Sequence, residues 1–309
     1  MWPSWPKRRG TERVLNSMNR IDLLFKRLKR ERKKALIPFI TAGDPDLATT
    51  RDLVFTLEEC GAHIIELGVP FSDPLADGPV IQAASLRALR QGIDLKRILA
   101  LVEEVRQRTD IPLILMTYYN PVYRFGLEEA ACQASKAGVD GFIIPDLPPE
   151  EAGEWRESAR ANNLDAIFLV APNTPLSRAR FIASKTSGFL YAVSVTGITG
   201  KRKGIPEGLT DYLRMLRGVT DKPIAVGFGI SSPSLVKDIR PLSDGVIVGS
   251  ALVDLLARYG DRKDGLSHMR SFVKSIAQAL TEESEGPGAS ARGIHIGLKT
   301  ISSPLMGED

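Results

Sequence analysis

This chain of 309 residues has few of the side chains that bind metals or form disulfide bridges. It contains two cysteines, Cys60 and Cys132, and three histidines, His63, His268 and His295, and none of them has the spacing of a metal site. We therefore expect no metal site. We interpret the two cysteines as core thiols of a cytoplasmic protein, because disulfides are rare in reducing compartments.

Long apolar runs and a dinucleotide-binding turn are also missing. No stretch approaches the roughly 18 to 20 apolar residues that cross a bilayer. The segment 1–17 lacks the apolar centre of a secretory signal, so we expect no membrane partner. A Gly-x-Gly-x-x-Gly turn is absent after the first predicted strand, where Ala-Gly-Asp-Pro follows at 42–45, which disfavours a doubly wound open sheet.

Positive charge is concentrated at the N-terminus. Residues 1–34 contain twelve Lys/Arg and three Asp/Glu, a net charge of +9; the whole chain carries +4, so the remainder carries −5. A basic arm is able to contact nucleic acid, but few aromatic residues interrupt this one, and we interpret it as a solvated tail with no nucleic-acid partner. We predict a flexible basic extension over 1–17, one catalytic domain over 18–282 and a flexible tail over 283–309.

Eight short apolar runs alternate with helical patterns along the chain. The runs lie at 36–41, 63–67, 112–118, 141–144, 166–170, 189–194, 223–227 and 245–248. Helical patterns between them include 47–60, 95–107, 127–137 and 150–162, and an amphipathic stretch begins at Met18. Continuous apolarity is typical of parallel strands covered on both faces. The sequence therefore predicts an α/β protein with a single (β/α)₈ TIM barrel and an extra N-terminal helix.

Candidate catalytic residues follow from this fold, because barrel enzymes hold their active sites at the C-terminal ends of the strands. No histidine lies at a predicted strand end. Glu66 ends the second apolar run, and Asp77 follows in a loop rich in Pro and Gly. By elimination these two carboxylates would perform the acid–base chemistry, with Tyr191 as a third member. The alternative is a structural role, in which Glu66 caps a strand and Asp73 or Asp77 caps a turn.

Two glycine-rich turns follow the seventh and eighth runs. They read Gly-Phe-Gly-Ile-Ser-Ser at 227–232 and Val-Gly-Ser-Ala at 248–251. Glycines allow close approach of the backbone to an anion, and barrels often bind phosphate at these two turns. The sequence therefore predicts a phosphate site, although the glycines alternatively serve only tight turns. The basic loop 196–204 is either a lid over that anion or a plain exposed loop.

Taken together, these segments closely resemble the alpha subunit of tryptophan synthase. The resemblance covers about residues 18–282 and rests on the segments 38–45, 66–79, 197–200, 227–231 and 249–250. The run 66–79, Glu-Leu-Gly-Val-Pro-Phe-Ser-Asp-Pro-Leu-Ala-Asp-Gly-Pro, is the most specific of them. The resemblance implies a lyase of tryptophan biosynthesis that cleaves indole-3-glycerol phosphate, by a retro-aldol reaction, into indole and glyceraldehyde 3-phosphate.

The resemblance also implies roles for individual residues. Glu66 would be the catalytic acid and base, Asp77 would bind the indole N–H and stabilise the cationic intermediate, and Tyr191 would line the same pocket. The residues implied to contact the indole or to close over the site are Phe39, Tyr118, Thr199 and Phe228. Those implied to bind the phosphate are Gly200, Gly229, Gly249 and Ser250.

A partner follows from the same resemblance. The chain would join a tryptophan synthase beta subunit in an α2β2 heterotetramer and would carry no cofactor, with pyridoxal phosphate expected only on the beta subunit. Val195 stands where some relatives have arginine, which bears on the contacts of the lid. The rival functions are another barrel enzyme acting on a phosphorylated sugar and a non-catalytic subunit that only activates a beta partner. The second rival predicts the loss of a catalytic carboxylate, but both Glu66 and Asp77 are present.

Overall fold

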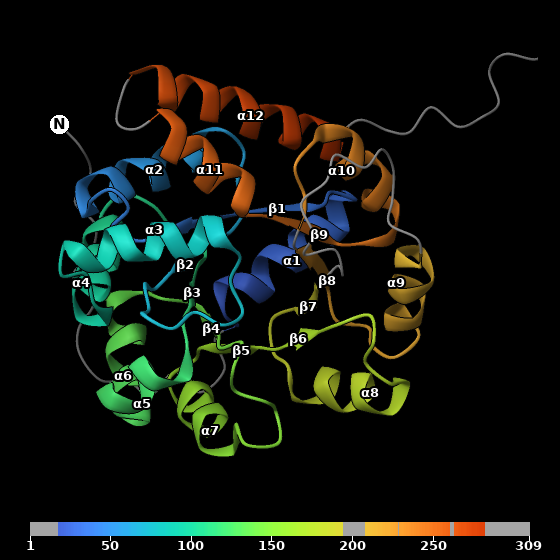
Figure 1. Ribbon diagram of the computed structural model, residues 1–309. Coiled ribbons are helices and arrows are strands. Elements are labelled where there is room, and N and C mark those ends of the chain that lie inside the picture. The colour runs from blue at the N-terminus through green and yellow to red at the C-terminus, as the bar shows by residue number, and fades with distance from the viewer. Residues whose placement is uncertain (1–17, 194–207, 228, 260–262, 282–309) are drawn as a thin grey trace, which may run out of the picture.

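The computed structural model describes residues 18–193, 208–227, 229–259 and 263–281, and shows a parallel barrel surrounded by helices (Figure 1). Within these ranges the strands are β1 Ala35–Thr41, β2 Ile65–Gly68, β3 Leu113–Met116, β4 Gly141–Ile143, β5 Asp165–Ile167, β6 Leu169–Val170, β7 Leu190–Val193, β8 Ile224–Gly227 and β9 Gly245–Val248. They pair in the order β5-β4-β3-β2-β1-β9-β8-β7-β6, and every pair is parallel.

Two of these strands are halves of one. Only Phe168 separates β5 from β6; β5 pairs with β4, and β6 pairs with β7. The Phe168 carbonyl accepts the N–H of Tyr191 at 3.1 Å, so the interrupted strand still bonds to its neighbour. The barrel therefore closes through this strand with eight strand positions, which confirms the predicted (β/α)₈ architecture.

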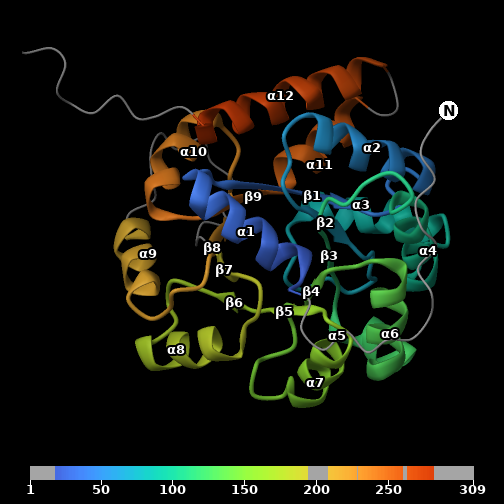
Figure 2. The ribbon, with the colours of Figure 1, turned by 180° about the vertical axis from the view of Figure 1, so that it is seen from behind.

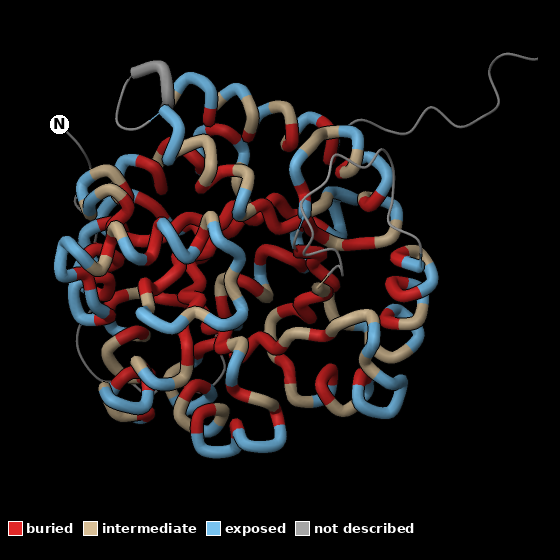
Figure 3. Tube along the Cα trace, viewed as in Figure 1, coloured by how far each residue is buried: buried red, intermediate tan, exposed pale blue. Residues whose placement is uncertain are grey.

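Helices surround the strands, as the views from the two sides show (Figures 1 and 2). They are α2 Leu47–Glu59, α3 Pro79–Arg90, α4 Leu95–Val105, α5 Tyr119–Phe125, α6 Leu127–Ala137, α7 Gly153–Ala161, α8 Leu176–Lys185, α9 Leu209–Arg217, α10 Pro233–Ile239, the 3₁₀ turn η1 Arg240–Leu242, α11 Ser250–Tyr259 and α12 Lys263–Thr281. Buried residues lie on the barrel side of the chain trace and exposed ones on the outside (Figure 3). None of the helices in the described ranges is long and apolar enough to span a membrane.

The first helix, α1 Arg20–Glu31, lies across one end of the barrel (Figure 2). Its buried face consists of the four residues that define the amphipathic pattern, Ile21, Leu24, Phe25 and Leu28. The Phe25 ring lies 5.6 Å from the ring of Phe189, which directly precedes β7, so α1 covers the N-terminal ends of the strands. The C-terminal ends remain for the chemistry.

The barrel interior is a small apolar cluster, separate from the larger one between strands and helices. On β1 its members are the alternate residues Ala35, Ile37 and Phe39, and Ile64 directly precedes β2. Successive strand residues point to opposite faces, so Glu66 points inward with Ile64. In the register it lies beside Phe39 of β1 and Ile114 of β3, both interior residues.

Candidate active site

Glu66 is a carboxyl group enclosed in the barrel. It is 0% exposed, and neither of its side-chain oxygens has a hydrogen-bond partner among the described residues. Burial and, to a smaller extent, the charge of Asp77 raise the pKa of Glu66 to about 8. At neutral pH Glu66 is therefore mostly a protonated acid that is ready to transfer its proton.

Asp77 approaches the same end of the barrel from the loop 69–78, which joins β2 to α3. The Tyr118 hydroxyl donates to Asp77 Oδ2 at 3.2 Å and accepts the N–H of Ala76 at 2.9 Å. Burial raises the pKa of Asp77 to about 6, against the opposing effect of the Tyr118 hydrogen bond. Asp77 is therefore mostly ionised at neutral pH, next to a carboxyl group that is mostly protonated.

The loop 69–78 is held at its C-terminal end, where it joins α3. Pro79 begins α3 directly after it, and the Gln82 side-chain amide donates to the Asp77 carbonyl at 2.9 Å. Within the loop, the Phe71 ring stacks on Tyr118 with 5.1 Å between ring centroids. No local sequence pattern predicts this stacking, because Phe71 and Tyr118 lie far apart in the chain.

Two aromatic side chains inside the barrel depend on glycines of neighbouring strands. A Cβ atom at Gly68 would lie 2.5 Å from the Phe39 ring, and one at Gly227 would overlap the Tyr191 hydroxyl and ring. Gly249 also borders Phe39, with a Cβ position 3.4 Å from its side chain. These glycines therefore leave the space in which Phe39 and Tyr191 lie at the C-terminal end of the barrel.

Tyr191 is a neutral hydrogen-bonding group. It is 3% exposed, and burial raises its pKa well above the ordinary value, with smaller contributions from the charges of Glu66 and Asp77. Its hydroxyl therefore stays protonated throughout the pH range in which the two carboxyl groups titrate.

The two predicted phosphate turns follow β8 and β9, which are adjacent strands of the barrel. Gly229 has φ +76°, a backbone conformation that favours glycine, and is exposed. Gly249 directly precedes α11, and its carbonyl accepts the amides of Leu252 and Val253 at 2.8 and 3.1 Å. Ser250 begins α11 and is exposed. This placement gives neighbouring backbone amides at a helix N-terminus.

Part of the predicted site lies outside the described residues. It comprises Thr199, Gly200 and Phe228, and Val195, which directly precedes the proposed lid 196–204, is outside them as well. The described side-chain members, Glu66, Asp77, Tyr191, Phe39 and Tyr118, come from β1, β2, β7 and the segments that follow β2 and β3, as expected of a barrel site. The described phosphate-site members lie at the turns after β8 and β9.

Two further polar side chains, Thr41 and Asp146, lie at or just after the C-terminal ends of strands. Thr41 is buried, and its hydroxyl has no hydrogen-bond partner among the described residues, so it is an additional polar group at this end of β1. Asp146 has a structural role, because its Oδ1 accepts the N–H of Tyr119 at 2.8 Å at the start of α5.

The family model, the related sequences and the solved structures that match this chain all belong to one family. The family model of the tryptophan synthase alpha chain matches residues 25–281. The tryptophan synthase alpha chain of Caldanaerobacter subterraneus subsp. tengcongensis is 49% identical over 263 residues, which cover 85% of this chain and 100% of that relative. That of Geotalea uraniireducens is 50% identical over 260 residues, covering 84% and 97%. The crystal structure of tryptophan synthase subunit alpha from Legionella pneumophila str. Paris matches with a TM-score of 0.79 and 39% identity, covering 85% of this chain and 99% of that one.

Proposed function

Because this chain belongs to the tryptophan synthase alpha chain family, we propose that Glu66 and Asp77 carry the acid–base chemistry of that family's reaction. The protein is a carbon–carbon lyase of tryptophan biosynthesis, which cleaves indole-3-glycerol phosphate into indole and glyceraldehyde 3-phosphate. The reaction breaks the bond between indole C3 and the adjoining carbon of the glycerol chain. It requires a proton at C3 and the removal of a proton from the hydroxyl group on that carbon.

Glu66 performs both proton transfers in this proposal. The raised pKa of Glu66, about 8, is the observation that supports it, because the side chain then holds a proton at neutral pH. Transfer of that proton to C3 gives an indoleninium cation. When the carbon–carbon bond breaks, its electron pair returns to the ring, and the ionised Glu66 accepts the hydroxyl proton as the aldehyde forms. Glu66 ends the cycle protonated, as it began.

Asp77 supplies the negative charge that the cation needs. The pKa of Asp77, about 6, leaves it ionised at neutral pH, and Tyr118 orients its carboxylate by a hydrogen bond. We assign to Asp77 the hydrogen bond from the indole N–H, which strengthens as the ring becomes positive. Each of these two groups is expected to contribute roughly 10² to 10⁴ in rate.

The remaining residues bind the substrate in this proposal. We place the indole ring among Phe39, Tyr118, Tyr191 and Phe228. The phosphate is assigned to the backbone amides of Gly200, Gly229, Gly249 and Ser250, at the turns that follow β8 and β9 and in the lid loop. Thr199 would close the lid over Asp77. The substrate's own indole ring serves as the electron sink, so the proposal requires no cofactor on this chain.

The protein acts together with the tryptophan synthase beta subunit. We propose an α2β2 heterotetramer in the cytoplasm, with pyridoxal phosphate bound only by the beta subunit. The loop 69–78 is a suitable contact, because the Leu75 side chain in it is exposed by 96% although it is apolar. The same loop carries Asp77, so docking of the beta subunit would act directly on a catalytic carboxylate.

The experiment that tests this function is indole release from indole-3-glycerol phosphate by the purified protein and by its Glu66→Gln variant. We expect the variant to lose roughly 10²-fold or more in kcat, while its affinity for glyceraldehyde 3-phosphate is preserved. Asp165→Asn is the matched control, because it neutralises another buried carboxyl group, at the opposite end of the barrel. A Glu66→Gln variant with wild-type kcat would contradict the assignment.

Adding a beta subunit tests the partner. We expect the beta subunit to accelerate indole release by the wild-type protein. Leu75→Asp should reduce this acceleration by a larger factor than it reduces the rate measured without the beta subunit. If neither preparation releases indole although the protein is folded, the activity of another sugar-phosphate barrel enzyme becomes the better explanation.

A further inference from the structure

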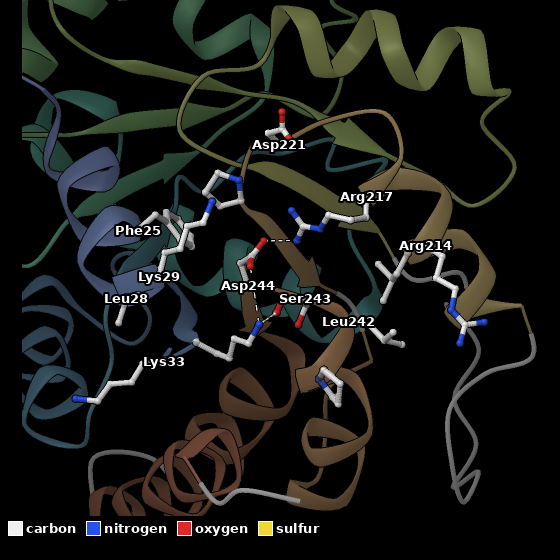
Figure 4. Close-up of a pocket in the computed structure, with 14 residues that line it drawn as sticks. Phe25, Leu28, Lys29, Lys33, Arg214, Arg217, Asp221, Leu242, Ser243 and Asp244 are labelled. Atoms are coloured by element: carbon white, nitrogen blue, oxygen red, sulfur yellow. Dashed lines mark hydrogen bonds and ion pairs between the residues drawn. The ribbon is translucent and has the colours of Figure 1, made fainter. Parts of the chain in front are cut away.

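A cavity of about 460 Å³ lies at the opposite end of the barrel from Glu66 (Figure 4). Lys34, Pro223 and Asp244 line it, and each stands directly before a strand, β1, β8 or β9. The other walls come mainly from α1 and α9. This volume falls in the range of small-molecule sites, about 300 to 1,000 Å³, and is far larger than one inorganic anion requires.

The charged side chains of the cavity are predominantly basic. The five basic ones are Lys29, Lys33, Lys34, Arg214 and Arg217, and the two acidic ones are Asp221 and Asp244. Figure 4 shows Arg217 and Asp244 pointing toward each other, whereas Lys33 points away from them. Three of the basic residues belong to the basic segment 1–34, and the five together outnumber the two carboxylates, so an anion is the ligand that the cavity attracts.

The Asp244 carboxylate lies beside two cationic side chains of the cavity, those of Arg217 and Lys34. Asp244 Oδ2 accepts from the Arg217 guanidinium and from the Ile224 N–H, and Asp244 Oδ1 lies 3.9 Å from Lys34 Nζ. Burial lowers the pKa of Lys34, and the charges of Arg217 and Arg240 lower it further, against the attraction of Asp244. Lys34 Nζ also donates to the Ser243 carbonyl at 2.5 Å. Two cations thus share one carboxylate, and a second anion beside Lys34 and Arg217 would balance the remaining positive charge.

The remaining walls are apolar. Their accessible part comes from Pro223 and from Pro241 and Leu242 of η1, whereas Phe25, Leu28 and Leu213 also line the cavity but are at most 5% exposed. A phosphate ion has no apolar surface to place against them, whereas the ring of an organic anion does. The combination of apolar lining with basic residues from α1, the segment before β1 and α9 is that of a site for an aromatic acid.

We propose that this cavity binds a small aromatic carboxylate, with its carboxylate beside Lys34 and Arg217 and its ring against Pro223, Pro241 and Leu242. The ligand would join the segment before β1 to α9 and to η1. Because α1 covers the N-terminal end of the barrel, occupancy would raise the melting temperature of the protein. The proposal concerns a site separate from the cleavage reaction and does not depend on the roles of Glu66 and Asp77.

The test is calorimetric titration of the full-length protein with benzoate, with benzyl alcohol as the uncharged analogue and with inorganic phosphate. Glyceraldehyde 3-phosphate is present at saturation, so that the catalytic end of the barrel is occupied. We expect benzoate to bind at least about tenfold more tightly than either other probe, since one lost charge-assisted contact corresponds to roughly that factor.

Variants with opposite effects separate binding from folding. Lys34→Gln combined with Arg217→Gln should weaken benzoate binding about tenfold or more, whereas Asp244→Asn should strengthen it because the competing internal anion is gone. Lys136→Gln, an exposed change on α6, is the matched control and should leave binding unchanged. Circular dichroism verifies the fold of each variant, and indole release by the Lys34 and Arg217 variants should remain at the wild-type rate.

Three results would overturn the proposal. One is equal benzoate affinity in the double variant and in Lys136→Gln. Another is binding of benzyl alcohol as tight as that of benzoate, which would show that the ligand need not be an anion. Equally tight binding of phosphate would show that the ligand need not be aromatic. The third is weaker benzoate binding by a folded Asp244→Asn variant. If the double variant does not fold, Arg217→Gln alone, whose side chain is 42% exposed, is compared with Asp244→Asn.

Discussion

At the scale of single residues, two carboxyl groups of similar chemistry take different protonation states. Glu66 is enclosed by the barrel and lacks a described hydrogen-bond partner, whereas Asp77 is only partly buried and accepts a hydrogen bond from Tyr118. The resulting pKa values, about 8 for Glu66 and about 6 for Asp77, leave one acid and one anion at neutral pH. Divergent pKa values in neighbouring carboxyl groups are a common basis for acid–base catalysis.

These pKa values predict a bell-shaped pH dependence of kcat/KM for indole release. The rate should fall below about pH 6, because Asp77 becomes protonated and loses its charge, and above about pH 8, because Glu66 loses its proton. The measurement is kcat/KM from pH 5 to 9. Asp77→Asn should remove the acidic limb, and an unchanged acidic limb in that variant would show that another group causes it.

Glycine at 227 is predicted to be required for the position of Tyr191. A methyl group there would overlap the Tyr191 hydroxyl and ring, and Tyr191 is buried in the barrel interior without space to move freely. We expect Gly227→Ala to lower the free energy of unfolding by about 1–3 kcal/mol and to lower kcat. Unfolding in urea and the indole assay measure both effects. Gly153→Ala, at which a Cβ meets nothing within 4 Å, is the control and should behave as wild type.

At the scale of elements, α3 begins at Pro79, two residues after Asp77, and an ion pair anchors it to the barrel. Arg87 of α3 forms two hydrogen bonds with Asp44, from Nε to Oδ1 and from Nη2 to Oδ2, both at 2.7 Å. Asp44 is buried and follows β1, which also supplies Phe39. This ion pair therefore ties the helix that begins just after Asp77 to a strand of the active site.

Arg87→Gln is expected to affect both stability and catalysis. It leaves the buried Asp44 carboxylate without its partner, so we expect a loss of about 1–3 kcal/mol in the free energy of unfolding. We also expect a lower kcat, because α3 positions the loop with Asp77. The same measurements on Arg90→Gln, an exposed change on the same helix, provide the control. A loss of stability without any change in kcat would show that the ion pair does not position the loop.

At the scale of the whole molecule, both ends of the barrel contain buried carboxyl groups, but their surroundings differ. Asp140 is buried at the N-terminal end and bonds to Arg106 at 2.7 Å, to Arg20 at 2.9 Å and to the Leu113 N–H at 2.8 Å. Asp165 is also buried there, but its Oδ2 lacks a partner among the described residues. Burial, and then the charge of Asp22, raise the pKa of Asp165 to about 7. Asp165 is therefore a source of pH-dependent instability. Burial also raises the pKa of Asp140, but the charges of Arg106 and Arg20 oppose that rise.

Stability should accordingly decrease as pH rises through the Asp165 titration. The folded state holds this proton up to about pH 7, whereas the unfolded chain releases it near pH 3.8, so the contribution to stability is full below pH 3.8 and is lost by about pH 7. Asp165→Asn removes this effect. The measured quantity is the free energy of unfolding of Asp165→Asn minus that of the wild type. We expect this difference to be more positive at pH 8 than at pH 5, by on the order of 1 kcal/mol or more.

Urea unfolding at the two pH values measures this difference. Asp211→Asn, at a carboxylate that is 85% exposed, is the control and should show no comparable pH dependence relative to wild type. A variant whose relative stability is the same at both pH values would show that Asp165 does not titrate in this range.

Much of the fold and of the candidate site follows from the sequence alone. Continuous apolar runs specified the strand positions, because burial on both faces leaves no polar alternation. The spacing of Ile21, Leu24, Phe25 and Leu28 specified the buried face of α1, because helical periodicity is a local property. Glu66 was identifiable because a carboxylate at the end of an apolar strand is costly without a partner or a function. The regions 1–17 and 283–309, which we predict to be flexible, lie outside the described residues.

Other features depend on the tertiary structure. The interruption of one barrel strand at Phe168, the stacking of Phe71 on Tyr118 and the space that Gly227 leaves for Tyr191 all join residues from separate segments. So does the cavity between α1 and α9. Local sequence patterns carry no information about such distances, because closure of the barrel determines which strand ends become neighbours. The sequence determined which residues are suited to acid–base chemistry, and the closed barrel, by burying Glu66 more completely than Asp77, decided which of the two holds the proton.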